Sequence, residues 1–142
     1  MGILVHNKTE STGIHENIVG ETAHWICREL KIPIVSLDII FIDDESLRVL
    51  HNKYLNDDTV TDVITFNLGD DSNCEGEVYI SLDQARKNAA YYHVSLINEI
   101  MRLIIHSCLH LAGYDDHNDK ERKIMKKKED YYLLIAVEKF LN

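Results

Sequence analysis

The chain has 142 residues and a net charge of −9, with 45% hydrophobic and 27% charged residues. These proportions are ordinary for a globular protein, and they predict one domain over residues 1–142 with a core of its own. No apolar stretch reaches the length of a membrane span. The N-terminus lacks the basic start and apolar run of a secretory signal, so we expect a cytoplasmic protein without a membrane partner.

The cysteines and the charge distribution exclude some classes of site and partner. Cys27, Cys74 and Cys108 are an odd number without a CxxC spacing. They argue against a disulfide framework or a four-cysteine zinc knuckle, and each is expected to be buried or half-buried. The acidic charge argues against a nucleic-acid partner, but residues 101–142 carry a balance of +1. The basic run there favours a solvated helix face over a phosphate-binding patch.

Hydrophobic spacing predicts an alternation of strands and helices. Residues 2–7 could form a strand, followed by a helix over 16–31, a strand over 32–43 and a helix over 43–55. Two strands over 60–68 and 76–82 come next, and helices over 82–93, 96–112 and 120–141 complete the chain. The pattern predicts an α/β domain of the α+β type, with one mixed sheet of about four strands packed with helices.

The stretch HSCLHLAGYDDH, residues 106–117, has the pattern of a metal site. His106 and His110 are four residues apart, so on a helix near the C-terminus both imidazoles lie on one face. Gly113 predicts the end of that helix, and a chain that turns there can bring a group from 115–117 to the same ion. Three protein ligands would leave a position for water, as in catalytic zinc sites. The alternative is a pair of surface histidines that share this spacing by chance.

The residue after the first histidine bears on the reaction. An HExxH zinc peptidase carries a glutamate there as general base, and this chain carries Ser107. A hydroxyl is not basic near neutral pH, so a peptidase is disfavoured. A metal-dependent hydrolase whose substrate supplies the proton acceptor, as a phosphate oxygen can, remains open. Nothing specific supports a hydrolase of small esters.

Four other residues have a structural interpretation that is favoured over a functional one. Thr61 and Asp62 precede a predicted strand, where they either orient the site or, as is favoured, form a turn. Glu99 lies seven residues before His106, about 10 Å along a helix axis, and is assigned no catalytic role. Trp25 shares helical spacing with apolar neighbours and is expected to be buried.

Three motifs resemble those of the YbeY family of ribosomal RNA maturation factors. HSCLHLAGYDDH is similar to the family signature HGxLHLxGYDH, and TDVITF (61–66) and GEVYIS (76–81) are similar to TDVLSF and GDIVIS. Met125 and Glu129 match a methionine and a glutamate downstream. The resemblance implies a single-strand-specific, zinc-dependent endoribonuclease for maturation of the 3′ end of small-subunit rRNA and for ribosome quality control. It implies rRNA, a ribosomal subunit or ribosomal proteins as partners, and a metal-activated water in place of a catalytic side chain.

The register of the resemblance assigns the metal ligands. The family's third histidine comes six residues after the second, a position that Asp116 occupies here, and Met125 follows at the family's spacing. We therefore expect one zinc ion at His106, His110 and Asp116. His117 would then lie beside the ligands, either facing the substrate or exposed on the loop. A one-residue insertion would make it the third ligand instead.

The contacts with RNA are less determined. The family's arginine after the aromatic residue of the LNxxYR stretch is Leu55 here, so a phosphate contact at that position is missing. The candidate phosphate contacts on the last predicted helix are Lys120, Arg122, Lys123, Lys126, Lys127 and Lys128. Of these, Lys120, Lys123 and Lys127 share one side of the helix and are the expected subset. The missing arginine, the missing glutamate and the acidic first hundred residues favour an alternative, a ribosome-associated assembly or binding factor with a structural metal.

Overall fold

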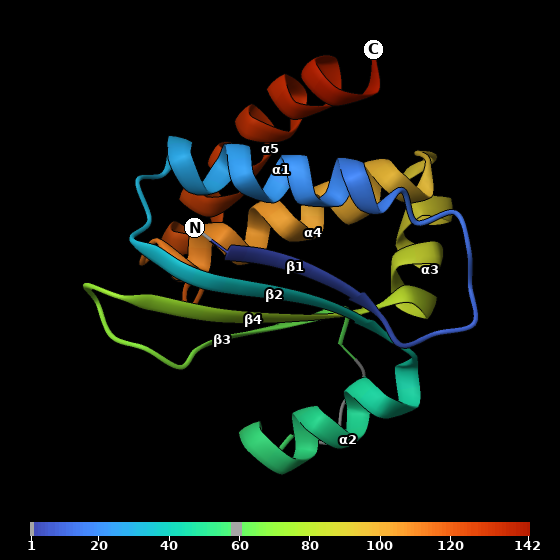
Figure 1. The fold of residues 1–142 in the computed structure, drawn as a ribbon, viewed down its shortest axis with the longest axis horizontal. Helices are drawn as coiled ribbons and strands as arrows, with labels where there is room; N and C mark the ends of the chain where they lie inside the picture. Colours follow the sequence, from blue (N-terminus) through green and yellow to red (C-terminus); the bar gives the residue numbers. More distant parts are fainter. Residues whose placement is uncertain (1, 58–60) are drawn as a thin grey trace.

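The computed structural model describes residues 2–57 and 61–142, which form a four-stranded sheet and five helices (Figure 1). The strands are β1 (Gly2–Asn7), β2 (Ile34–Ile42), β3 (Val63–Asn67) and β4 (Cys74–Ser81). The helices are α1 (Glu16–Glu29), α2 (Asp44–Leu55), α3 (Leu82–Tyr92), α4 (Leu96–Leu111) and α5 (Asp119–Leu141). The elements occur in the predicted order, and residues 2–7 do form a strand. The predicted strand over 60–68 begins at Val60, which lies outside the described residues.

The sheet has the order β1-β2-β4-β3. β2 pairs in parallel with both β1 and β4, whereas β3 pairs with β4 in antiparallel register. The predicted mixed sheet of about four strands is therefore confirmed. β4 begins two residues before the predicted strand, because Cys74 already pairs with Ile34 of β2.

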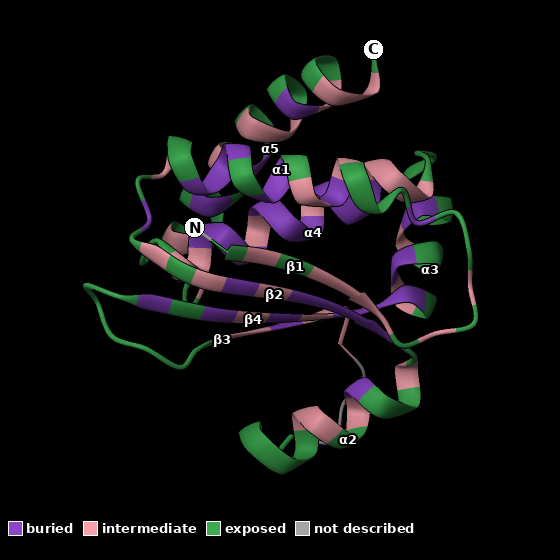
Figure 2. Ribbon diagram, in the orientation of Figure 1, coloured by how far each residue is buried: buried purple, intermediate pink, exposed green. Residues whose placement is uncertain are grey.

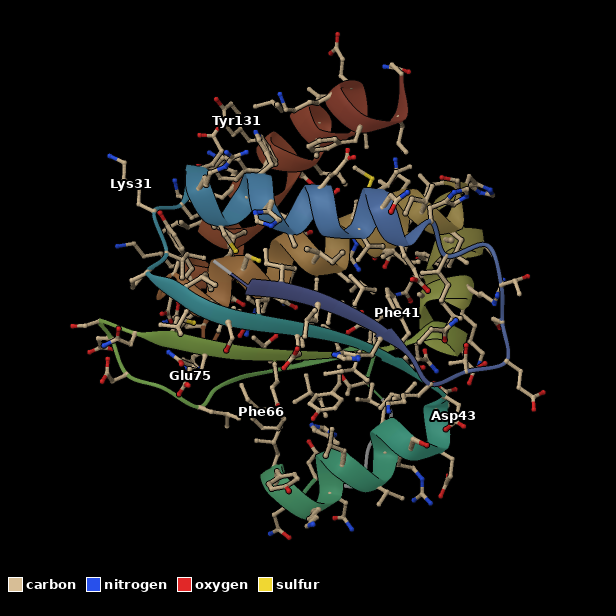
Figure 3. The ribbon with its side chains drawn as sticks, in the orientation of Figure 1. Lys31, Phe41, Asp43, Phe66, Glu75 and Tyr131 are labelled. Atoms are coloured by element: carbon tan, nitrogen blue, oxygen red, sulfur yellow. The ribbon has the colours of Figure 1, made fainter. Side chains whose placement is uncertain are left out.

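Helices cover the two faces of the sheet unequally (Figure 1). The main core lies where α1 and α4 pack over one face, and α5 packs on the outer side of these helices. Figure 2 shows the buried residues concentrated in this layer. On the opposite face α2 covers a smaller core of Ile40, Ile42, Leu47 and Ile64, with Phe66 of β3 between the sheet and the helix (Figure 3).

The predictions for the core are confirmed. All three cysteines are free and buried. Trp25 is 8% exposed and meets Tyr132 and Phe140 of α5 edge to face. In the described part of the chain, no single helix is long and apolar enough to span a membrane.

α4 is the central helix of the main layer, and its end is set by glycine. The N–H groups of Gly113 and Tyr114 donate to the carbonyl oxygens of His110 and Leu109, both at 3.0 Å. Gly113 has φ +101°, a conformation that L side chains rarely adopt. The glycine therefore turns the chain back toward the last turn of α4, as the sequence predicted.

Candidate metal centre

One stripe of α4 escapes burial. From Glu99 to His110 every residue is buried except Arg102, His106 and His110, which are partly exposed. These three follow one another at intervals of four, so they lie on the same side of the helix. The other sides of α4 pack against the sheet and against α1, α3 and α5. The surrounding core thus forces the two histidines to face the same opening.

Three ligand atoms converge at this opening. Nε2 of His106 and Nε2 of His110 are 3.2 Å apart, and Oδ2 of Asp116 lies 4.0 Å from the first and 3.5 Å from the second. A point equidistant from the three atoms lies about 2.1 Å from each, the bond length of zinc to imidazole nitrogen and carboxylate oxygen. The three side chains therefore fit a divalent metal ion of this size.

The outer contacts of both imidazoles fix their tautomers. Nδ1 of His106 lies 2.8 Å from Oε1 of Glu129 on α5, and Nδ1 of His110 lies 3.0 Å from the carbonyl oxygen of Tyr114. Because a carbonyl and an ionised carboxylate only accept, each Nδ1 carries the proton and each Nε2 presents a lone pair. Two lone pairs and a carboxylate then face one another without a hydrogen between them, and these acceptors repel one another. A bound cation would remove this repulsion, and outer acceptors of this kind commonly orient metal-binding histidines.

The pKa shifts agree with this protonation pattern. Burial lowers the pKa of His110, and the neighbouring His106 lowers it further against the opposing charge of Asp116. Burial alone would raise the pKa of Glu129, but the hydrogen bond with His106 and the charge of Arg102 outweigh it, so this pKa is lowered. A neutral imidazole and an ionised outer carboxylate are the forms that metal binding needs.

Arg102 connects the centre to a buried polar network. Its Nε and Nη2 donate to the two carboxylate oxygens of Glu99 at 2.7 and 2.6 Å, and Nη1 donates to Oε2 of Glu129 at 3.2 Å. Glu99 is 1% exposed and also accepts from Asn88 at 3.0 Å. Asn88 donates to Asp62 as well, at 3.1 Å. Glu99 thus contacts Arg102 rather than the metal ligands.

Two hollows open on the centre, and His106 and Asp116 line both of them. The first, of about 520 Å³, lies against the start of β3, and we call it the strand cleft. Its other linings are His51, Leu55, residues 61–65, His110 and His117. The second, of about 280 Å³, lies against α5, and we call it the helix cleft. Its other linings are Tyr92, Arg102, Arg122, Met125, Lys126 and Glu129.

The remaining predicted residues have defined places around these clefts. His117 is 78% exposed, lies 3.6 Å from Asp115 and is outside the group of three converging atoms, although it lines the strand cleft. Thr61 and Asp62 form the bend before β3 and line the same cleft. The lysines expected to contact phosphate are exposed and line neither cleft: Lys120, Lys123 and Lys127. Their role stays a prediction.

Sequence reasoning missed Arg102, and it ranked Arg122 and Lys126 below the subset of Lys120, Lys123 and Lys127 as candidate phosphate contacts. Arg102 had a detectable signal, because it precedes His106 by four residues on the same helix. Arg122 and Lys126 had only the weaker signal of sharing a side with Glu129. The spacing of α5 alone does not say which of its sides faces α4.

Comparison with known proteins supports the assignment of the three motifs. The family model described as Endoribonuclease YbeY matches residues 4–135. A relative of that description from Karelsulcia muelleri is 42% identical over 108 residues, which cover 76% of this chain and 77% of the relative. Another from Chlorobaculum tepidum is 36% identical over 133 residues, which cover 94% and 96%.

A solved structure shows the same fold. The solution structure of a protein from Thermotoga maritima is 27% identical and superposes with a TM-score of 0.70. The alignment covers 96% of this chain and 90% of the other. The family match extends over all three sequence motifs and over the elements around the candidate metal centre, from β3 to residue 135 within α5. The chain therefore belongs to the YbeY endoribonuclease family.

Proposed function

We propose that this chain is a metal-dependent endoribonuclease that cleaves single-stranded RNA, with zinc held by His106, His110 and Asp116. The convergence of three acceptor atoms around a point at zinc-bonding distance carries the proposal. The curated relatives are described as endoribonucleases, and the chain covers most of their length. Ribosomal RNA or a ribosomal subunit in the cytoplasm is the substrate that the resemblance favours.

Each side chain of the centre then has a distinct part. His106, His110 and Asp116 hold the ion, while Glu129 and the carbonyl of Tyr114 keep both imidazoles in the required tautomer. Zinc at such a site supplies Lewis-acid stabilisation of the charge that develops on a phosphate during hydrolysis. Because both clefts open on His106 and Asp116, an RNA strand bound at the ion has room to continue in two directions, as cleavage at an internal bond requires.

The experiment is a metal-content and cleavage assay on the full chain. Wild-type protein is analysed for bound metal by elemental analysis and then incubated with single-stranded and duplex RNA of one sequence. We expect one zinc per chain and cleavage of the single strand that stops on chelation and returns with zinc. Metal-loaded protein that leaves the single strand intact would overturn the proposal.

A binding factor with a structural metal is the second candidate. The observation that favours it is the strand cleft, where none of the described lining residues is lysine or arginine. The same assay separates the two. A binding factor retains the metal and binds RNA or a ribosomal subunit without cutting it.

A further inference from the structure

We propose that the helix cleft is a nucleotide subsite beside the cleaved bond, in which a base stacks on Tyr92 and its phosphate contacts Arg122 and Lys126. The proposal rests on the proposed function, since it concerns the RNA that this function would cleave. It goes further by stating which of the two clefts holds the backbone and which residues bind it.

The distribution of cations decides between the clefts. Among the described residues, those lining the strand cleft include no lysine or arginine, whereas Arg102, Arg122 and Lys126 all line the helix cleft. Binding of single-stranded RNA depends on cationic groups along its backbone. Within the described ranges 2–57 and 61–142, such groups line the helix cleft and not the strand cleft.

Arg122 and Lys126 are placed to receive a phosphate. They lie four residues apart on α5, hence on one side of it, and their side chains are 55% and 61% exposed. Nη1 of Arg122 donates to the backbone carbonyl of Asp116 at 3.2 Å, which holds the guanidinium beside a metal ligand, and Nη2 donates to the exposed Asp119 at 2.5 Å. Nζ of Lys126 lies 2.9 Å from the exposed Asp130 and 3.5 Å from Glu129. Surface pairs of this kind are weak and yield to a phosphate.

Arg102 has a different role in the same cleft. Its guanidinium is bound by both oxygens of the buried Glu99 and by Glu129, so its charge is already compensated. It also lies 5.8 Å from the ring centre of Tyr92. Arg102 therefore positions the tyrosine ring and leaves the phosphate to the two cations of α5.

Tyr92 provides the surface for a base. Its side chain, at the end of α3, is 55% exposed although it is large and apolar, and it lines the wall of the cleft. Aromatic rings bind the bases of single strands by stacking, with little preference for sequence. The ring and the cations thus supply the two contacts that a nucleotide in a single strand needs.

The test compares variants of the zinc-loaded full chain on a fluorescent single-stranded RNA oligonucleotide. Dissociation constants are measured by anisotropy on ice, before cleavage is measurable, and KM and kcat by initial rates. The cleft variants are Tyr92→Ala, Arg122→Gln and Lys126→Gln. The matched controls are Tyr131→Ala, whose exposed ring lines neither cleft, and Lys139→Gln at the other end of α5. Metal content is measured for each, because Arg122 contacts the loop of Asp116.

We expect each cleft variant to weaken binding and raise KM about tenfold, the range for loss of one stacked base or phosphate contact. Metal content should stay at the wild-type value, the controls should bind like wild type, and Tyr92→Phe should retain most of the affinity. The inference is overturned if the wild type binds and cuts the RNA and the cleft variants have the same dissociation constants as the control variants. RNA that is bound but not cut removes the proposed function and leaves the subsite test intact, while RNA that is not bound at all removes both.

Discussion

Nδ1 of His106 on α4 and Oε1 of Glu129 on α5 are joined by a hydrogen bond of 2.8 Å. The two residues are 23 positions apart, and Glu129 is nearly fully buried. Its second oxygen accepts from Arg102, which lies one turn before His106. A single carboxylate therefore orients one of the proposed metal ligands and joins the helix that carries it to the next helix. The geometry of the metal centre depends on the packing of α4 against α5.

Glu129→Gln should weaken zinc binding about 10- to 100-fold, the range seen when an outer partner of a metal-bound histidine is replaced. The amide is neutral, so it neither strengthens the basicity of His106 nor compensates Arg102. Competition with a chromogenic chelator measures the affinity. Glu138→Gln removes an exposed carboxylate from the same helix and should leave the affinity unchanged. Equal affinities for the two variants would show that Glu129 does not orient the ligand.

The identity of the third ligand gives a sharper test. Asp116→Ala removes one of the three converging oxygen and nitrogen atoms, so elemental analysis should find the metal lost or its affinity greatly reduced. His117→Ala removes an exposed imidazole outside this group and should retain one zinc per chain. Loss of zinc from His117→Ala alone would place the ligand one residue further along the loop.

The depressed pKa of His110 predicts how the metal-free protein responds to acid. Because its pKa in the folded state is below the unfolded value of 6.5, the unfolded chain binds the extra proton first as pH falls. The contribution of His110 to stability is therefore fully present above pH 6.5 and is lost as pH falls from there through the folded pKa. Urea unfolding from pH 7.5 to 5 measures this loss.

His110→Gln supplies the comparison for this pH dependence. Glutamine does not titrate, so the variant should lose less stability than wild type over the same interval, whatever its stability at pH 7.5. Both proteins are measured in chelator, so that metal release does not add to the slope. Parallel curves for the two proteins would mean that burial does not disfavour the charged form of His110.

The parts of the centre that the sequence predicts involve residues close together in the chain, whereas the parts that it does not predict involve contacts between distant residues. His106, His110 and the stop at Gly113 follow from helical spacing and from one glycine, so the sequence alone indicates them. Asp116 needed the register of the family motifs, because three residues of the loop could serve as a ligand. The contact of Glu129 with His106 depends on how α4 and α5 cross, and no local pattern encodes that angle.

The expected phosphate contacts on α5 also depended on packing that the sequence does not reveal. Helical spacing indicates that Lys120, Lys123 and Lys127 share one side of α5, but it does not say where that side points. The burial of Met125 and Glu129 against α4 settles the orientation, and it brings Arg122 and Lys126 to the helix cleft instead. A run of basic residues predicts that a helix is charged, but it does not predict which side of that helix faces the site.

Two glycines should respond to alanine with opposite signs. An added Cβ meets no atom within 4 Å at either Gly113 or Gly20, so side-chain packing gives the two substitutions no different effect. The difference comes from the backbone conformation at each glycine. Gly113 has φ +101°, and alanine there should destabilise the protein by about 1–2 kcal/mol. Gly20 lies inside α1 with ordinary helical backbone, and alanine there should stabilise by about 0.5–1 kcal/mol.

Urea unfolding of both variants with metal removed measures these differences. Gly113→Ala should also lower zinc affinity, because the turn at Gly113 brings Asp116 back to the end of α4. Gly20→Ala, at a position in α1 that lines neither cleft of the centre, should bind zinc like wild type. If Gly113→Ala is as stable as wild type and binds zinc equally well, the left-handed turn does not set the position of the third ligand.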